Sequence, residues 1–208
     1  MDILTLKSKE RLGCNRCEKC CIYRGDIRLI PINACRISKY LKLPIKEFIE
    51  KYTDRLEDSK LELVLKTTTE LKQCILYDNK IKGCSIHPVK PMQCVMFPLV
   101  PENLKRDYFY NSKQCVLEDA KEITINEWVN GNNNIYSKNK KIYMEWIQFI
   151  EWIQPKLYNV SNEKIEEFYK ILFEEYDLNK INLKSQMRRN MYKVENMIIA
   201  LRNNYNKF

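Results

Sequence analysis

Apolar residues in the C-terminal part of the chain recur every three or four positions, which is the spacing of one face of an α-helix. One such run covers residues 142–153 and stops before Pro155, and two more cover residues 165–176 and 187–201. We interpret the aromatic and methionine residues of these runs as core faces, because an amphipathic helix buries its apolar stripe. The pattern therefore predicts three helices that pack together.

The N-terminal part shows shorter patterns that predict a mixture of helices and strands. Asn33 can cap one helix, and Pro44 suits the first turn of a second helix whose apolar face lies within residues 45–52. Residues 61–69 are apolar and β-branched, as expected of a strand, and residues 107–111 predict another short strand.

A hairpin and a proline-rich segment are predicted between these two strands. Residues 74–77 and 83–86 flank Asp78-Asn79-Lys80, which is a turn sequence. Prolines then occur at positions 88, 91, 98 and 101. Because proline fixes its own backbone and restricts the residue before it, we expect this segment to be extended and irregular.

The cysteines divide the chain into two parts. All nine lie between Cys14 and Cys115, and the composition changes near residues 118–123. We therefore predict a cysteine-cluster metal-binding domain at residues 1–118 and a helical C-terminal section at residues 119–208 packed on it. The expected fold class is α+β and helix-rich, with a small irregular Cys-rich core containing short strands.

The predicted cellular location and the net charge of the chain limit the classes of function that we expect. No apolar run approaches the roughly 18 residues of a membrane helix. Residues 1–14 contain Asp2 and Glu10 and lack the apolar stretch of a secretory signal, so we expect a cytoplasmic protein and no membrane partner. The formal net charge is +9, but Lys is abundant together with Asn, Ile and Tyr, as an AT-rich genome would produce. Since no basic stripe with interleaved aromatics stands out, nucleic acid is not the partner we favour.

The strongest chemical signal is the opening cluster, Cys14-Asn-Arg-Cys17-Glu-Lys-Cys20-Cys21. In a reducing compartment, clustered cysteines are more often metal ligands or redox groups than disulfides. Two residues between thiolates allow a turn to aim both sulfurs at one cation, as in zinc knuckles and iron–sulfur loops. Adjacent side chains in an extended segment point to opposite faces. Cys20 and Cys21 are therefore poorly placed to bind the same ion, although a turn could permit it. We expect either that they serve two neighbouring sites, or that one binds while the other packs or does chemistry.

A second cluster is formed by Cys74, Cys84 and Cys94, each separated from the next by nine residues, and Cys115 follows a predicted strand. Together with the opening four, these make eight thiols. Eight suffice for two four-ligand sites, or for one polynuclear cluster with spare thiols. Cys35 lies inside a predicted helix, where we expect a buried, inert thiol.

His87 and Lys90 lie between the last two cysteines of the second cluster. His87 is the only histidine, and it is either a metal ligand, a hydrogen-bond donor to a ligand, or a surface residue. Lys90 either lowers the pKa of nearby thiols or is an ordinary solvated charge. No residue can be assigned a catalytic role from the sequence.

These motifs resemble the YkgJ-type cysteine-cluster family, which is described as zinc- or iron-chelating. Its Cys-x2-Cys-x2-Cys-Cys opening matches residues 14–21, and Cys74-Ile-Leu-Tyr matches a second element. Residues 84–98 match a third, and Cys115 a later cysteine. His87, Lys90 and Val95 stand where that family has Tyr, Arg and Arg. The resemblance covers about the first 118 residues and implies zinc or iron bound by cysteine thiolates, with an iron–sulfur cluster as an alternative.

The chain is also distantly similar to flagellin lysine N-methylases, which carry a similar cysteine cluster. That similarity implies an alternative function, an iron–sulfur-dependent enzyme that modifies a side chain of a protein substrate. However, the four glycines form no GxGxxG-like nucleotide loop, and the Cys-x3-Cys-x2-Cys spacing of radical enzymes is absent. A third hypothesis is a zinc-containing nucleic-acid-binding module. The primary expectation is a thiolate metal-binding protein whose partner is the metal ion.

Overall fold

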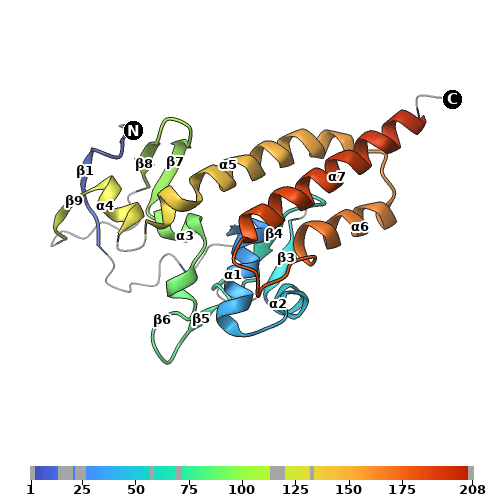
Figure 1. The fold of residues 1–208 in the computed structure, drawn as a ribbon. Helices are drawn as coiled ribbons and strands as arrows, with labels where there is room; N and C mark the ends of the chain where they lie inside the picture. The colour runs from blue at the N-terminus through green and yellow to red at the C-terminus, as the bar shows by residue number, and fades with distance from the viewer. Residues whose placement is uncertain are drawn as a thin grey trace. The chain divides into compact units, whose positions relative to one another are not determined.

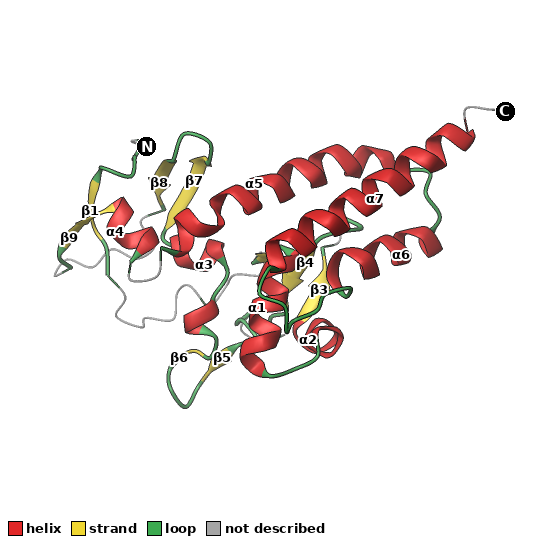
Figure 2. Ribbon diagram, in the orientation of Figure 1, coloured by secondary structure: helices red, strands yellow, loops and turns green. Residues whose placement is uncertain are grey.

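The computed structural model describes residues 3–13, 21, 27–56, 59–68, 72–112, 120–131 and 134–205. The chain forms two compact units, each built from two separate segments. Unit 1 comprises Met1–Ile27 and Lys66–Met144, and unit 2 comprises Arg28–Leu65 and Glu145–Phe208. Short strands in small sheets and a helical C-terminal section confirm the predicted helix-rich α+β class (Figure 2). The predicted division into a cysteine-cluster domain at residues 1–118 and a helical section at residues 119–208 stays a prediction.

Unit 2 is a small antiparallel sheet with a set of helices (Figure 1). The sheet has the strand order β2-β4-β3. Its strands are β2 (Arg28–Leu29), β3 (Thr53–Arg55) and β4 (Leu63–Leu65). Its helices are α1 (Pro31–Leu41), α2 (Ile45–Tyr52), the second half of α5 (Ile135–Ile153), η2 (Gln154–Lys156), α6 (Asn162–Phe173) and α7 (Leu183–Tyr205).

The core of unit 2 confirms the interpretation of the aromatic and methionine stripes. Phe173 of α6 contacts Trp146 of α5 edge-on, with ring centroids 5.6 Å apart, and it also contacts Tyr169. Met187 and Val194 on α7 are fully buried. These side chains leave water together, and each fully buried large apolar side chain contributes roughly 1.5–3 kcal/mol to folding.

The starts of α1 and α2 differ slightly from the predicted caps. Asn33 is not the capping residue of α1: the helix begins at Pro31, and the Asn33 side chain accepts a hydrogen bond from the Ile30 N–H (3.3 Å). Pro44 precedes α2 rather than lying in its first turn. Proline is favoured at both helix starts because its fixed backbone angle suits a first turn and it has no N–H to leave unpaired.

In its described residues, unit 1 forms three two-stranded antiparallel sheets and short helices. The strand pairs are β1 (Lys9–Arg11) with β9 (Glu122–Thr124), β5 (Tyr77–Asp78) with β6 (Gly83–Cys84), and β7 (Leu99–Asn103) with β8 (Tyr108–Asn111). The helices are η1 (His87–Val89), α3 (Met92–Met96), α4 (Ile125–Asn130) and the first half of α5. The predicted hairpin at residues 74–86 is therefore confirmed as β5–β6.

The prediction of an extended proline-rich segment was wrong in two places. Pro88 lies in the first turn of the 3₁₀ helix η1, and Pro91 immediately precedes α3. Pro101 lies in β7, which pairs with β8 alone. A two-stranded sheet consists only of edge strands, so it tolerates a residue without an N–H.

The core of unit 1 lies where α3, α4 and the β7–β8 hairpin meet. It contains Met92, Met96, Phe109, Ile125 and other buried residues. The Trp128 indole N–H of α4 donates to the carbonyls of Met96 and Phe97, at 3.2 and 3.1 Å. This core therefore fixes the C-terminal end of α3, the helix that carries Cys94.

Asp107 joins the β7–β8 hairpin to the first half of α5. Its carboxylate accepts hydrogen bonds from the Tyr136 hydroxyl (2.5 Å) and the Lys140 ammonium (2.6 Å). Burial and the Asp107 carboxylate raise the pKa of Tyr136, so the phenol stays protonated and remains a donor.

Within the described residues, no helix combines the length and apolar character needed to cross a bilayer.

Candidate metal centre

The structure describes half of the eight cysteines predicted as ligands. Cys21, Cys74, Cys84 and Cys94 are described, and all four belong to unit 1. The other four predicted ligands lie outside the described residues: Cys14, Cys17, Cys20 and Cys115.

Backbone hydrogen bonding brings the end of the opening cluster to the start of the second. The Cys74 N–H donates to the Cys21 carbonyl at 2.7 Å. On its other side, Cys74 forms an isolated β-bridge with Thr67, and the Ile75 N–H donates to the Lys66 carbonyl at 3.0 Å. Cys74 is buried. Cys21 and Cys74 are thus neighbours in space although they are far apart in the sequence.

The β5–β6 hairpin places Cys84 in the same small element as Cys74. The Tyr77 N–H donates to the Cys74 carbonyl (2.9 Å), which starts the turn into β5, and Tyr77 then pairs with Cys84 across the hairpin. The Ser85 N–H and hydroxyl both donate to the Leu76 carbonyl, at 3.0 and 2.8 Å. These bonds fix the register of the hairpin and hence the position of Cys84 relative to Cys74.

Cys94 lies on α3, one short helical segment after the hairpin. Ile86 is buried and accepts a hydrogen bond from the Val89 N–H at 2.9 Å, which closes the turn of η1. The Cys94 N–H then donates to the Pro91 carbonyl at 3.0 Å in the first turn of α3. Cys84 and Cys94 are both half-buried.

His87 and Lys90 lie on the segment that joins Cys84 to Cys94. His87 is the first residue of η1 and is exposed, whereas Lys90 follows η1 and is half-buried. Their predicted roles, as a ligand or donor for His87 and as a charge near the thiols for Lys90, remain predictions.

The described residues alone do not assemble a complete ligand set. Across the described ranges, no three side chains of Cys, His, Asp or Glu converge closely enough to hold one ion. Because four of the eight predicted thiols lie outside those ranges, the division of the cysteines among one or two sites also remains a prediction.

Cys35 is the cysteine that the sequence analysis set apart, and the structure bears out its burial. It lies in the middle of α1 in unit 2 and has no exposed surface. Burial raises the pKa of its thiol well above the usual range, so the neutral form predominates. Metals bind the thiolate form. Cys35 therefore behaves as a small apolar core residue.

Sequence reasoning missed the part of this region contributed by Lys66 and Thr67. Both residues use their backbone to hold the segment that carries Cys74. The signal available was the β-branched run of residues 61–69, which predicts a strand but not its partner.

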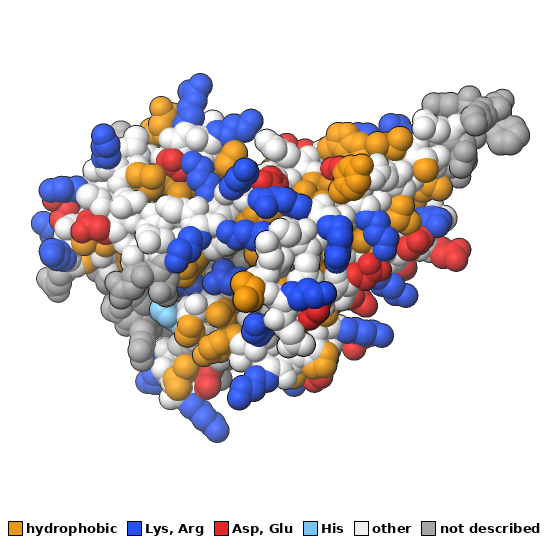
Figure 3. Space-filling model, viewed as in Figure 1, with side chains coloured by type: hydrophobic (Ala, Val, Ile, Leu, Met, Phe, Trp, Pro, Cys, Tyr) orange, Lys and Arg blue, Asp and Glu red, His pale blue; other side chains and the backbone are white. Residues whose placement is uncertain are grey.

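Over the face shown in Figure 3, Lys and Arg side chains are scattered, with Asp and Glu among them, rather than gathered in one stripe.

Comparison with known proteins agrees with the cysteine pattern. Residues 13–128 match the model of the family CxxCxxCC, described as "Putative zinc- or iron-chelating domain". The matched range contains both cysteine clusters, Cys115, His87 and Lys90. No solved structure matches the fold.

Proposed function

Since the chain belongs to the CxxCxxCC family of zinc- or iron-chelating domains, we propose that its two cysteine clusters hold the metal together, as thiolates of one centre. The proposed ligands are Cys14, Cys17, Cys20, Cys21, Cys74, Cys84, Cys94 and Cys115. Metal chelation is the function that the family match supports, and the thiolate ligand set is the finer step proposed here.

The observation that carries this proposal is the hydrogen bond from the Cys74 N–H to the Cys21 carbonyl. A centre that draws ligands from both clusters requires the two segments to meet, and this bond is a direct contact between them. The hairpin pairs Cys84 with Tyr77, whose N–H donates to the Cys74 carbonyl, so the segments that carry Cys74 and Cys84 are joined by backbone bonds.

The donor chemistry fits the metals named by the family. Thiolate ligands suit zinc and iron–sulfur clusters, whereas calcium and magnesium prefer oxygen. Eight thiolates carry more negative charge than one divalent ion neutralises, so nearby cations would stabilise the centre. Lys90 is placed in sequence to supply one, and His87 could serve as a further ligand or donate a hydrogen bond to a coordinating sulfur.

The test is to purify the protein anaerobically and to measure zinc, iron, acid-labile sulfide and the visible spectrum on the same sample. Cys74→Ala should lose most of the bound metal. Cys35→Ala is the matched control, because Cys35 is also buried but lies in unit 2, and it should retain the metal. Equal metal content in both variants and in the wild-type protein would contradict the proposed ligand set.

The identity of the metal decides between the two functional classes raised by the sequence. Zinc without sulfide or colour would support a structural or metal-handling centre. Iron with sulfide, and a broad absorption band expected of thiolate-ligated clusters, would favour the iron–sulfur enzyme acting on a protein side chain. In that case, binding of S-adenosylmethionine by the cluster-loaded protein is the next measurement, and absence of binding would reject the methyl-transfer version.

A further inference from the structure

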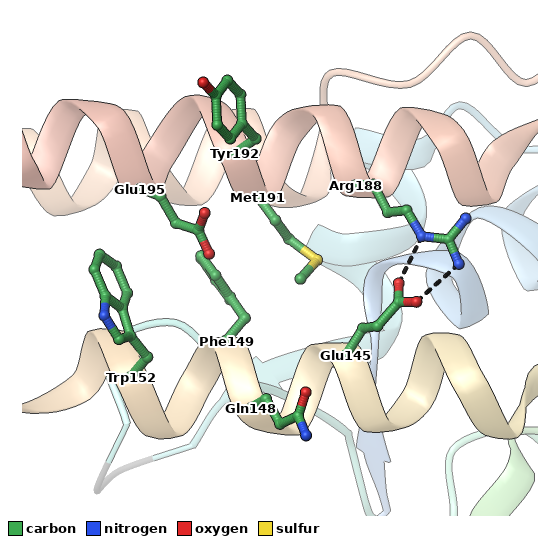
Figure 4. A pocket seen from close by; sticks show the side chains of 8 residues that line it. All are labelled: Glu145, Gln148, Phe149, Trp152, Arg188, Met191, Tyr192 and Glu195. Atoms are coloured by element: carbon green, nitrogen blue, oxygen red, sulfur yellow. Dashed lines mark hydrogen bonds and ion pairs between the residues drawn. The ribbon is translucent and has the colours of Figure 1, made fainter.

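A groove lies in unit 2 between the second half of α5 and α7. It has a volume of about 280 Å³ and is lined by side chains from both helices (Figure 4). Its floor is apolar, because Phe149 and Met191 are both buried there. No cysteine lines the groove, so it is separate from the proposed metal ligands.

One end of the groove is closed by an ion pair. The Arg188 guanidinium donates two hydrogen bonds to the Glu145 carboxylate, at 2.6 and 3.0 Å, and so bridges α7 and α5. Paired in this way, the two charges neutralise each other, and the bidentate geometry makes the bridge specific. The ion pair therefore contributes little net charge to the groove.

The other end carries a carboxylate that is not neutralised. Glu195 is half-buried and lines the groove, and it has no hydrogen bond or ion pair with any residue that the structure describes. In Figure 4 its carboxylate points toward Phe149, on the side of the groove where Trp152 lies. Partial burial beside apolar rings costs solvation energy, which a bound cation would recover.

Trp152 lies at the same end of the groove as Glu195 (Figure 4). The Lys156 ammonium lies 4.1 Å from the centroid of the indole ring and donates to the Trp152 carbonyl at 2.6 Å. This contact shows the indole already engaged with one ammonium group. Lys156 donates to the Trp152 carbonyl and Arg188 pairs with Glu145, so neither cation is bonded to Glu195.

We propose that this groove binds a cationic side chain, lysine or arginine, of a partner protein. Its aliphatic stem would pack on Phe149 and Met191, and its charge would meet the Glu195 carboxylate. Lysine and arginine suit such a site because both bury an aliphatic stem while keeping a charged head. Tyr192, which is 64% exposed at the rim, offers further surface to the partner.

The test is a titration of the full-length protein followed by NMR through the indole N–H signal of Trp152, assigned by its loss in Trp152→Phe. The probes are N-acetyl-lysine methylamide, N-acetyl-arginine methylamide and the neutral N-acetyl-norleucine methylamide. At least one cationic probe should shift the signal saturably, and norleucine should bind more weakly. Glu195→Gln should weaken cation binding by about threefold to tenfold, the range expected of one partly exposed ion pair.

Glu151→Gln is the matched control, because Glu151 is also on α5 in unit 2 but is exposed and does not line the groove. It should leave the affinity unchanged. The proposal would be overturned if neither cationic probe bound more tightly than the norleucine probe, and also if Glu195→Gln kept the wild-type affinity. Far-UV circular dichroism of each variant verifies that the helices are intact.

Discussion

Asn190 on α7 completes the C-terminal end of α6. Its side-chain amide is almost fully buried and donates to the carbonyls of Ile171 (2.8 Å) and Glu175 (3.0 Å). The Ile171 carbonyl needs this donor, because the Glu175 N–H that would normally reach it bonds to the Lys170 carbonyl instead. Replacement by alanine removes both bonds and leaves the Ile171 carbonyl buried without its donor.

The expected cost follows from these two bonds. A typical hydrogen bond contributes about 0.5–1.5 kcal/mol net, and a buried group left unsatisfied costs about 1–3 kcal/mol. We therefore expect Asn190→Ala to lower the free energy of unfolding of unit 2 by about 2–3 kcal/mol. That is a large share of the roughly 5–15 kcal/mol that stabilises a typical domain.

The assay is urea unfolding followed by far-UV circular dichroism and tryptophan fluorescence, with the shift in midpoint converted through the slope of the transition. Asn196→Ala is the control, since Asn196 is an exposed asparagine on the same helix, and it should change stability by less than about 0.5 kcal/mol. A loss of similar size in both variants would refute the capping role of Asn190.

Three further predictions concern capping, pH and metal. The Thr124 hydroxyl accepts the Glu127 N–H (3.1 Å) at the start of α4, so Thr124→Ala should cost about 1 kcal/mol in urea unfolding, and no loss would reject the cap. Burial raises the pKa of Tyr169 from its ordinary 10 to about 12. The unfolded chain therefore releases the phenol proton at a lower pH than the folded protein. The stability that protonated Tyr169 contributes is present below pH 10 and is lost as pH rises toward 12. Tyr169→Phe should therefore lose less stability over that range than the wild-type protein, and parallel pH profiles would contradict this. Metal removal by a chelator should unfold unit 1, because structural zinc contributes about 10–16 kcal/mol in small metal domains. The NMR signals of α6 and α7, in unit 2, should persist. Loss of the NMR signals of both units together would show that the units unfold as one.

Long periodic helices were the most predictable part of the fold. The three C-terminal runs correspond to α5, α6 and α7, because side chains on one face of a long helix must repeat regularly to reach a common core. Only the ends differ: α6 stops at Phe173, short of the predicted residue 176. The sequence Thr124-Ile-Asn-Glu127 was a capping box that could have revealed α4 but was not recognised.

Strand partners could not be predicted, since the strands are very short. β1 pairs with β9, so Lys9 lies opposite Thr124 although the two residues are far apart in the sequence. Two- and three-residue strands carry too little alternation to specify a partner. The same limit applied to the metal centre. Cysteine spacing predicts a set of candidate ligands, which stays a prediction. The meeting of Cys21 with Cys74 depends on backbone groups, which every residue type carries.

The sequence of unit 1 is interrupted by an inserted segment whose first and last strands lie side by side. The inserted residues 28–65 begin in β2 and finish in β4, and these strands are paired, with Arg28 opposite Val64. Paired strands lie about 4.8 Å apart, a gap that one or two residues can span. Deleting residues 28–65 together with residues 145–208, and joining residue 27 to residue 66 through a short glycine linker, would therefore give a continuous miniature of the cysteine-bearing unit. A simple truncation near residue 118 would instead leave α1 without α6 and α7, which pack against it.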